Sequence, residues 1–313
     1  MKNKMKKILI VGSLNMDVVI ETSQMPKCGE TIAGKSVTHI PGGKGANQAY
    51  AAGKLGGDVT MLGAVGKDSN GKILLDNLNS VGVDCSKIEK IEGVQTGQAF
   101  ITVNDEGDNS IIVISGANGK VSKELVDQNR KLITECDIVV LQLEIPIEVV
   151  EHVKEIAVQE GKTVIVDPAP AVDGIPEKFW QGIDYIKPNE TELEKLTNCR
   201  TGSWKDVVEA GKIMLGKGVK NVIATLGAEG CMLVNKDQEI FYPAHKVKSV
   251  DTTAAGDCFT AAFALALSKE KTCEEAIRFA QKASSIVVTR KGAQTSIPTI
   301  EEMNNNTLCK EEE

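Results

Sequence analysis

The stretch Val250-Asp-Thr-Thr-Ala-Ala-Gly-Asp257 organises the rest of the chain, and an apolar run of good helix formers, Cys258–Leu267, follows it at once. Small residues ahead of such a run predict a tight turn that leads into the N-terminus of a helix. The first backbone N–H groups of a helix have no partner inside it, and together with the helix dipole they attract anions. The stretch therefore indicates a phosphate-binding turn in an α/β fold.

The acidic residue at the end of this turn needs an explanation, because a carboxylate repels phosphate. One explanation is that Asp257 is a base that removes the proton from a hydroxyl group attacking the phosphate. The other is structural, since an acidic residue in the first turn stabilises a helix by about 1 kcal/mol. The stretch by itself leaves both open.

The composition is that of a soluble globular protein, with 42% apolar and 25% charged residues among 313. The net charge of −7 argues against a nucleic-acid partner, and no apolar run is long enough to cross a membrane. Three widely spaced histidines disfavour a zinc site. Eight cysteines without a C-x-x-C pair are typical of free thiols in a reducing compartment, so we expect a cytoplasmic protein.

Short apolar runs alternate with helical patterns along most of the chain. Such alternation predicts a doubly wound, mostly parallel sheet with helices on both faces. The expected strands are 7–12, 59–65, 138–143, 163–166, 185–186 and 221–224, and the expected helices are 48–55, about 66–81, 146–160, 204–215, 258–267 and 273–289.

Ligands of such sheets bind beyond the carboxyl ends of the strands. Polar residues follow several of the expected strands, and each alone is explained as a helix cap or turn residue. Together they indicate a site at this edge: Glu144, Asp167, Asn189, Glu190 and Thr225.

Two N-terminal segments also have residues suited to a small polar ligand. Asn15 and Asp17 follow the first strand and could bind hydroxyl groups, although turn chemistry also explains them. In Gly42-Gly43-Lys44 the Ser or Thr of a phosphate loop is replaced by Gly45, so that interpretation fails. Paired glycines ahead of a helix instead suit a backbone wrapped closely around a ligand, with Lys44 and Asn47 as polar contacts.

The runs 31–40, 97–103 and 110–114 do not fit the alternating pattern, so we assign them to a small separate sheet. The acidic segment 104–109 lacks the spacing of a calcium loop and is expected to be a hairpin turn.

Two of these segments resemble the signatures of the ribokinase-like sugar kinases. Asp251–Asp257 is similar to D-T-x-[GA]-A-G-D, and Gly42–Asn47 is similar to G-G-x-[GA]-x-N, in the same order along the chain. The resemblance covers residues 6–300. The chain departs from it at Ala254, where many relatives have Gly, and at Cys258, where Thr is frequent.

The resemblance implies ATP-dependent phosphorylation of the 5-hydroxyl of D-ribose to ribose 5-phosphate, with Asp257 as general base. Four segments together favour this activity over the adenosine- and fructose-kinase branches of the family: Asn15–Asp17, Gly42–Asn47, Asp251–Asp257 and Thr289–Gln294. A kinase for another small sugar or nucleoside stays open, as does a sugar-binding regulator without catalysis. By resemblance the anion hole is formed by Ala254, Ala255, Gly256 and Asp257, and the sugar is bound by Asn15, Asp17, Gly43, Lys44, Asn47, Glu144 and Asp257.

The same resemblance implies ATP, Mg²⁺ and K⁺. A T-x-G-x-x-G loop at 225–230 and an N-x-x-E element at 189–192 are assigned to the nucleotide. The resemblance also assigns residues around Gly292 to the monovalent cation, although an ordinary helix C-cap at Gly292 explains that segment as well. The assigned residues are Asn189, Thr225, Gly227, Gly230, Gly256 and Gln281 for ATP, Glu192 for Mg²⁺, and Asp251, Thr253, Val287, Arg290, Gly292 and Ser296 for the monovalent cation, mostly through carbonyls.

The resemblance finally implies one kinase domain over 1–313. Its small sheet, from about 17–41 and 97–115, is expected to be a lid over the sugar and the contact surface of a homodimer.

Overall fold

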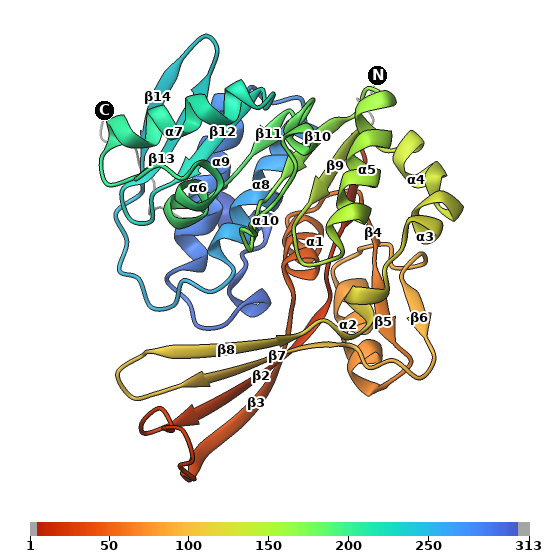
Figure 1. Cartoon of the computed structure of the whole chain (residues 1–313), viewed down its shortest axis with the longest axis vertical. Coiled ribbons are helices and arrows are strands. Elements are labelled where there is room, and N and C mark those ends of the chain that lie inside the picture. The colour runs from red at the N-terminus through yellow and green to blue at the C-terminus, as the bar shows by residue number, and fades with distance from the viewer. Residues whose placement is uncertain (1–4, 306–313) are drawn as a thin grey trace.

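The computed structural model describes residues 5–305, and it is built around one eight-stranded sheet (Figure 1). The order of the strands is β14-β13-β12-β11-β10-β9-β1-β4. Six of its strands are parallel to one another: β1, β4, β9, β10, β11 and β12. The other two, β13 and β14, form an antiparallel extension at one edge. Their bounds are β1 Ile8–Val11, β4 Val59–Leu62, β9 Ile138–Leu141, β10 Thr163–Val166, β11 Tyr185–Ile186, β12 Asn221–Thr225, β13 Gly230–Asn235 and β14 Glu239–Pro243.

Helices cover both faces of this sheet because its strands are apolar on both sides. In β1, Ile8 and Ile10 join one core, and Leu9 and Val11 join the other. The first face is covered by α1 Lys44–Lys54, α2 Ser69–Ser80, α8 Ala255–Ser268, α9 Cys273–Val287 and α10 Ile300–Asn305. The second is covered by α3 Lys123–Gln128, α4 Arg130–Glu135, α5 Ile147–Gln159, α6 Glu190–Thr197 and α7 Trp204–Gly216.

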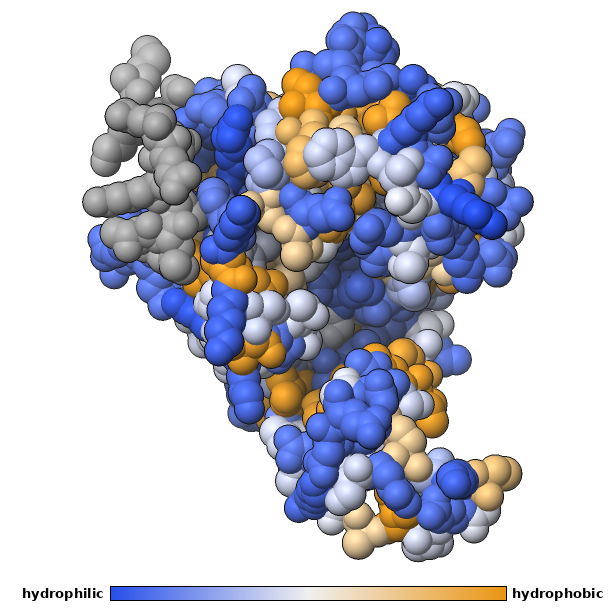
Figure 2. Space-filling model, turned by 90° about the vertical axis from the view of Figure 1, so that its left-hand side faces the viewer, coloured by the Kyte–Doolittle hydropathy of each residue, from blue (hydrophilic) through white to orange (hydrophobic). Residues whose placement is uncertain are grey.

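A second sheet of four strands projects from this body (Figures 1 and 2). Its order is β3-β2-β7-β8, and a hollow separates it from the body in Figure 2. The outer strand β8 is exposed at all six positions, so it belongs to neither core. The strands are β2 Asn15–Thr22, β3 Gly34–Gly42, β7 Gly97–Val103 and β8 Asn109–Ile114.

The fold class expected from the sequence is confirmed, and the differences are local. The run 59–65 divides at Gly63 into β4 and β5 Ala64–Gly66, which pairs with β6 Glu89–Ile91. A Cβ at Gly63 would lie 2.7 Å from the carbonyl oxygen of Gly12, so only glycine fits where the chain passes this close to another backbone. Helix α1 begins at Lys44 rather than at Gln48, and the β13–β14 hairpin and the helices α3, α4, α6 and α10 were not predicted.

The topology brings the carboxyl ends of β1, β9, β10, β11 and β12 to the same edge of the sheet. The N-termini of α1 and α8 reach this edge as well, and these two helices pack against each other. In the described part of the chain no helix is long and apolar enough to cross a membrane.

Candidate active site

The N-terminus of α8 forms one wall of a cavity of about 740 Å³ at the carboxyl edge of the sheet. Ala254 precedes the helix in the left-handed conformation, with a φ of 61°. This conformation turns the chain abruptly into the helix, so that Ala255 and Gly256 line the cavity. Among the described residues no side chain caps this N-terminus, which leaves it suited to an external anion.

Asp257 lies in the first turn of α8 and is buried. Its Oδ2 accepts a hydrogen bond from Asn47 Nδ2 at 2.9 Å, and its Oδ1 accepts one from Gln48 Nε2 at 3.1 Å. Burial raises the pKa of this carboxyl, and the negative charge of Asp167 raises it further, while Lys44 and the two amides oppose the rise. Asp257 is therefore a carboxyl with fixed oxygens and increased basicity.

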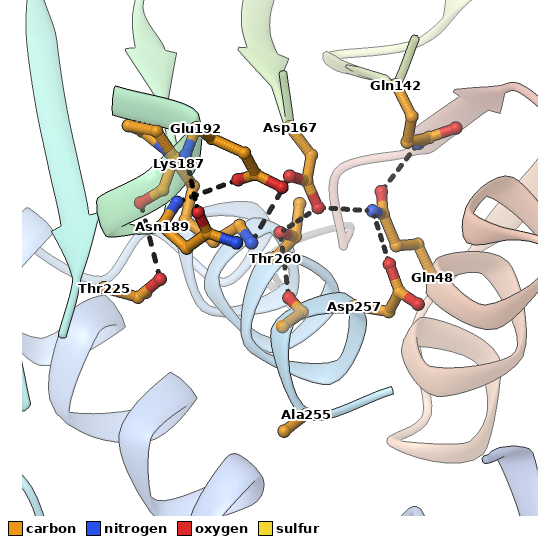
Figure 3. Close-up of polar contacts among 12 residues, drawn as sticks. Gln48, Gln142, Asp167, Lys187, Asn189, Glu192, Thr225, Ala255, Asp257 and Thr260 are labelled. Carbon is orange, nitrogen blue, oxygen red and sulfur yellow. Dashed lines mark hydrogen bonds and ion pairs between the residues drawn. The ribbon is translucent and has the colours of Figure 1, made fainter. Parts of the chain in front are cut away.

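A chain of amides fixes this carboxylate relative to a second one (Figure 3). The amide nitrogen of Gln48 also donates to Asp167 Oδ2 at 2.9 Å, so two carboxylates share one amide group. Gln142 in turn donates to Gln48 Oε1 at 2.6 Å, and the Thr260 hydroxyl donates to Asp167 at 3.3 Å. All of these side chains are buried, which holds the arrangement rigidly.

The nucleotide residues expected from the sequence line the same cavity. Asn189 and Glu192 form a capping box at the start of α6, with both hydrogen bonds at 2.8 Å. Burial raises the pKa of Glu192, and so does the charge of Asp167. Gln281 donates to the carbonyl of Tyr242 at 2.9 Å. The expected residues on this cavity are Lys44, Asn189, Glu192, Thr225, Gly227, Gly230, Ala254, Ala255, Gly256, Asp257 and Gln281.

The expected sugar residues gather on the other side of Asp257. Glu144 Oε2 accepts from the Ser13 hydroxyl at 2.5 Å and from the Lys44 backbone at 3.0 Å. Burial together with the charges of Glu144 and Asp257 raises the pKa of Asp17 to about 7. Three carboxyl groups thus influence one another across a small polar region.

Glycines and amides complete this region. A Cβ at Gly43, where φ is 86°, would lie 2.7 Å from the Asn15 backbone nitrogen, so the chain in front of α1 packs directly on this strand. The side chain of Asn15 is fixed by Asn118, whose amide donates to its oxygen at 2.7 Å. Asn47 accepts from Gln294 at 2.9 Å while donating to Asp257.

The expected cation residues come from two segments that lie side by side. Asp251 accepts from the backbone and hydroxyl of Thr253 at 2.9 and 2.6 Å, and from the Gly292 backbone at 2.9 Å. The Arg290 guanidinium donates to Glu302 at 2.7 Å and to the Ser296 carbonyl at 3.5 Å. Val287 is the last residue of α9, and its carbonyl accepts a hydrogen bond from the Arg290 backbone at 3.0 Å. Within residues 5–305 no cluster of three or more His, Cys, Asp or Glu side chains could hold a metal ion.

Comparison with known proteins identifies the family. The chain matches the pfkB family of carbohydrate kinases over residues 5–300. It belongs to this family. It is 40% identical to ribokinase from Haemophilus influenzae over 95% of this chain and 97% of that protein. It is 38% identical to deoxyribokinase from Salmonella typhi, over 95% of this chain and 97% of that protein.

Solved structures of pfkB-family kinases agree with this assignment. Arabidopsis thaliana ribokinase, solved with ribose and ATP, superposes with a TM-score of 0.91 at 35% identity, over 96% of this chain and 98% of that one. Thermotoga maritima ribokinase superposes with a TM-score of 0.87 at 43% identity, over the same shares. The family and the fold expected from the sequence are both confirmed.

Several residues of this pfkB-family site were not predicted as site residues. Lys187 and Gln142 follow β11 and β9, so the rule that ligands bind at strand ends could have found them. Gln48, Asn118 and Gln294 lie in a helix or in 3₁₀ turns, and nothing in their local sequence marks them.

The carboxyl cluster predicts how the stability of this kinase depends on pH. Below pH 3.9, roughly the pKa of an unfolded Asp, Asp17 is protonated in the folded and in the unfolded protein. Between this pH and about 7, the pKa of Asp17 in the folded protein, it stays protonated only in the folded protein. Its contribution to the free energy of unfolding is therefore lost as the pH rises from about 4 to 7. Asp17→Asn should stabilise the ligand-free protein at pH 8, by about 2 kcal/mol after allowance for partial exposure, and much less at pH 4.5.

The measurement is urea unfolding of the wild type and of Asp17→Asn at both pH values. Asp58→Asn, at an exposed position away from the site, is the control and should differ little from the wild type at either pH. An equal difference at pH 4.5 and 8 would show that Asp17 does not titrate in this range.

Proposed function

We propose that this chain is an ATP-dependent ribokinase, which transfers the γ-phosphoryl group of ATP to the 5-hydroxyl of D-ribose. The observation that carries the proposal is the position of Asp257. It lies between the polar region around Asp17 and Glu144 and the cavity at the N-terminus of α8. The relatives of this chain include a ribokinase solved with ribose and ATP, which supports the same two substrates here.

Asp257 acts as the general base. Burial raises its pKa and so makes it a stronger base, and Asn47 and Gln48 hold its two oxygens in place. The hydroxyl oxygen attacks the γ-phosphorus as its proton passes to Asp257, and the bond to the bridging oxygen of ADP breaks. The backbone N–H groups of Ala254–Asp257 stabilise the negative charge that develops on the phosphoryl oxygens.

The substrates lie on opposite sides of this carboxylate. Ribose hydroxyls bind to Asn15, Asp17, Asn47, Glu144 and the loop at Gly43–Lys44. ATP occupies the 740 Å³ cavity, with the triphosphate near Lys44 and Gly256. The nucleotide is also contacted by Asn189, Thr225, Gly227, Gly230 and Gln281.

The site has oxygen donors of the kind that both proposed cations prefer. Glu192 is a partly buried carboxylate close enough to Asp167 for its pKa to rise, so a divalent cation there would relieve repulsion. Mg²⁺ bound with ATP would neutralise the charge of the triphosphate. A monovalent cation would be held by Asp251 and Thr253 with the carbonyls of Val287, Arg290, Gly292 and Ser296, in segments that Asp251 already joins.

The small sheet is proposed to be a lid on a single domain and a dimer surface. In β8 four consecutive apolar residues, Ile111–Ile114, have exposed fractions of 54, 63, 54 and 47%. Their side chains point alternately to the two faces of this edge strand, and an exposed apolar edge strand of this kind is typical of a protein interface, which a second copy of the chain would cover. A cytoplasmic location suits the free thiols of the seven described cysteines; Cys309 lies outside the described residues.

A kinase for deoxyribose is the second candidate, since a deoxyribokinase is 38% identical over nearly the whole chain. The two substrates differ by one hydroxyl group. A sugar-binding regulator without catalysis is less well supported, because the base and the anion-binding turn are both present.

Substrate choice is tested by ADP release from MgATP with D-ribose, 2-deoxy-D-ribose, D-fructose and adenosine, each in K⁺ and in Na⁺. We expect ribose to have the highest kcat/KM, and K⁺ to raise it above the Na⁺ value, because K⁺ orders the turn before α8. Higher turnover with another acceptor would show that ribose is not the substrate, while the proposed phosphoryl transfer would stand. No turnover with any acceptor would favour the regulator.

Removing the base tests the mechanism. Asp257→Asn keeps the size of the side chain but cannot accept the proton, and its single amide oxygen can keep one of the two hydrogen bonds from Asn47 and Gln48. We expect kcat to fall at least ~10²-fold, with the affinity for ribose changed by no more than a few fold. Steady-state kinetics and ribose calorimetry measure the two effects. Turnover close to that of the wild type would refute the assignment of Asp257 as base.

The dimer surface is tested by Ile112→Glu, which places a charge in the centre of the exposed apolar strand. We expect the wild type to sediment at twice the mass of one chain and the variant at the mass of one chain. Ile73→Glu, at an exposed position on α2, is the control and should leave the mass unchanged. A monomeric wild type would refute the proposed interface.

A further inference from the structure

Lys187 is a buried lysine at the carboxyl end of β11. Its side chain is 8% exposed, and its Nζ lies 3.3 Å from Oδ1 of Asp167, whose side chain is 1% exposed. The two residues follow the paired positions Val166 and Ile186 on neighbouring parallel strands, so the sheet itself places them next to each other. Burying two charges costs free energy that their attraction does not always repay, and a buried pair therefore indicates a role other than stability.

The ammonium group lies directly beside the turn that is proposed to bind the phosphoryl group. A Cβ at Gly256 would come within 3.2 Å of Lys187 Nζ, and this group is the nearest to that position. Lys187, Asp167 and Gly256 all line the 740 Å³ cavity. In Figure 3 Lys187 and Asp167 lie above the first turns of α8, on the side of Asn189 and Glu192.

The charges of the cavity also favour a cation near this point. Asp167, Asp257 and Glu192 are carboxylates on its wall, and a triphosphate would add further negative charge. Burial lowers the pKa of Lys44, but the negative charges of Asp257, Asp167, Glu144 and Glu192 raise it more. The wall also carries Glu190 and the exposed Lys246, so Lys44 and Lys187 are its two lysines that are not exposed, and together they offset part of the negative charge that a polyanion would meet.

We infer that Lys187 is a further catalytic residue of the proposed kinase, which donates from its ammonium to an oxygen of the transferring phosphoryl group. Asp167 is the positioning residue that holds this ammonium over Gly256, and Gln48 and Thr260 hold Asp167. Lysine supplies a compact charge that satisfies the increased negative charge of the phosphoryl oxygens during transfer. This inference rests on the proposed function, and its test distinguishes failure of the role of Lys187 from failure of the proposed function.

The first variant is Lys187→Met, which keeps the length of the side chain and removes the charge. We expect kcat to fall about 10²-fold, with KM for ribose within about threefold of the wild type. Calorimetry without sugar should show a loss of at least roughly tenfold in affinity for MgATP and little loss for MgADP, because only ATP carries the transferring group. Lys154→Met is the control, since Lys154 is also buried but lies on α5, near the ring of Phe179, and should keep full turnover.

The double variant Lys187→Met/Asp167→Asn separates catalysis from charge balance, because it removes the buried pair and leaves no unpaired charge. Our inference requires that the double variant regain thermal stability lost by the single variant and stay at least roughly 30-fold slower than the wild type. Turnover of the double variant within threefold of the wild type would refute the catalytic role of Lys187. Equal losses of ATP and ADP affinity would refute its contact with the transferring group.

Failure of the proposed function would look different from either result. If the wild type and Lys154→Met release no ADP with any sugar, the proposed reaction is wrong. The comparison of ATP with ADP affinity would then still decide whether Lys187 contacts the terminal phosphate.

Discussion

The geometry of the site depends on one amide group, Nε2 of Gln48, that is shared by two buried carboxylates. Its two hydrogens point to Asp257 on α8 and to Asp167 at the end of β10. Gln48 itself lies on α1, and Gln142 at the end of β9 fixes its oxygen. Two helices and two strands thus meet at a single side chain, and the position of each carboxylate is determined by the packing of the others.

This arrangement makes the ligand-free site electrostatically unfavourable. Burial raises the pKa values of Asp17, Asp257 and Glu192, and neighbouring carboxyl groups raise them further. A fold selected for stability alone would place apolar residues at these positions. Hydroxyl donors of a sugar and the cations that accompany a nucleotide would supply what the carboxylates lack, so the same features that reduce stability favour binding of those ligands.

Local sequence predicts the parts of the site that single turns provide. The turn at Asp251–Asp257 and the loop at Gly42–Asn47 are marked by small residues that only a tight turn or close packing requires, and both were predicted. The amides of Asn118 and Gln294 act on residues more than a hundred positions away, at Asn15 and Asn47. No periodicity or spacing encodes such contacts. The β13–β14 hairpin was missed because the glycine-containing loop at 225–230 was assigned only to the nucleotide and not also to the turn that leads into β13.

The two sheets are joined at the site rather than away from it. Strand β2 begins at Asn15, where it pairs with Gly42 of β3 on one side and with Gly97 of β7 on the other. The far edge of this sheet is the apolar strand β8. Backbone hydrogen bonds connect β8 through β7 to β2, so the apolar edge and the residues Asn15 and Asp17 belong to one continuous sheet. Assembly through this sheet and binding of a polar substrate would then stabilise the same arrangement of strands.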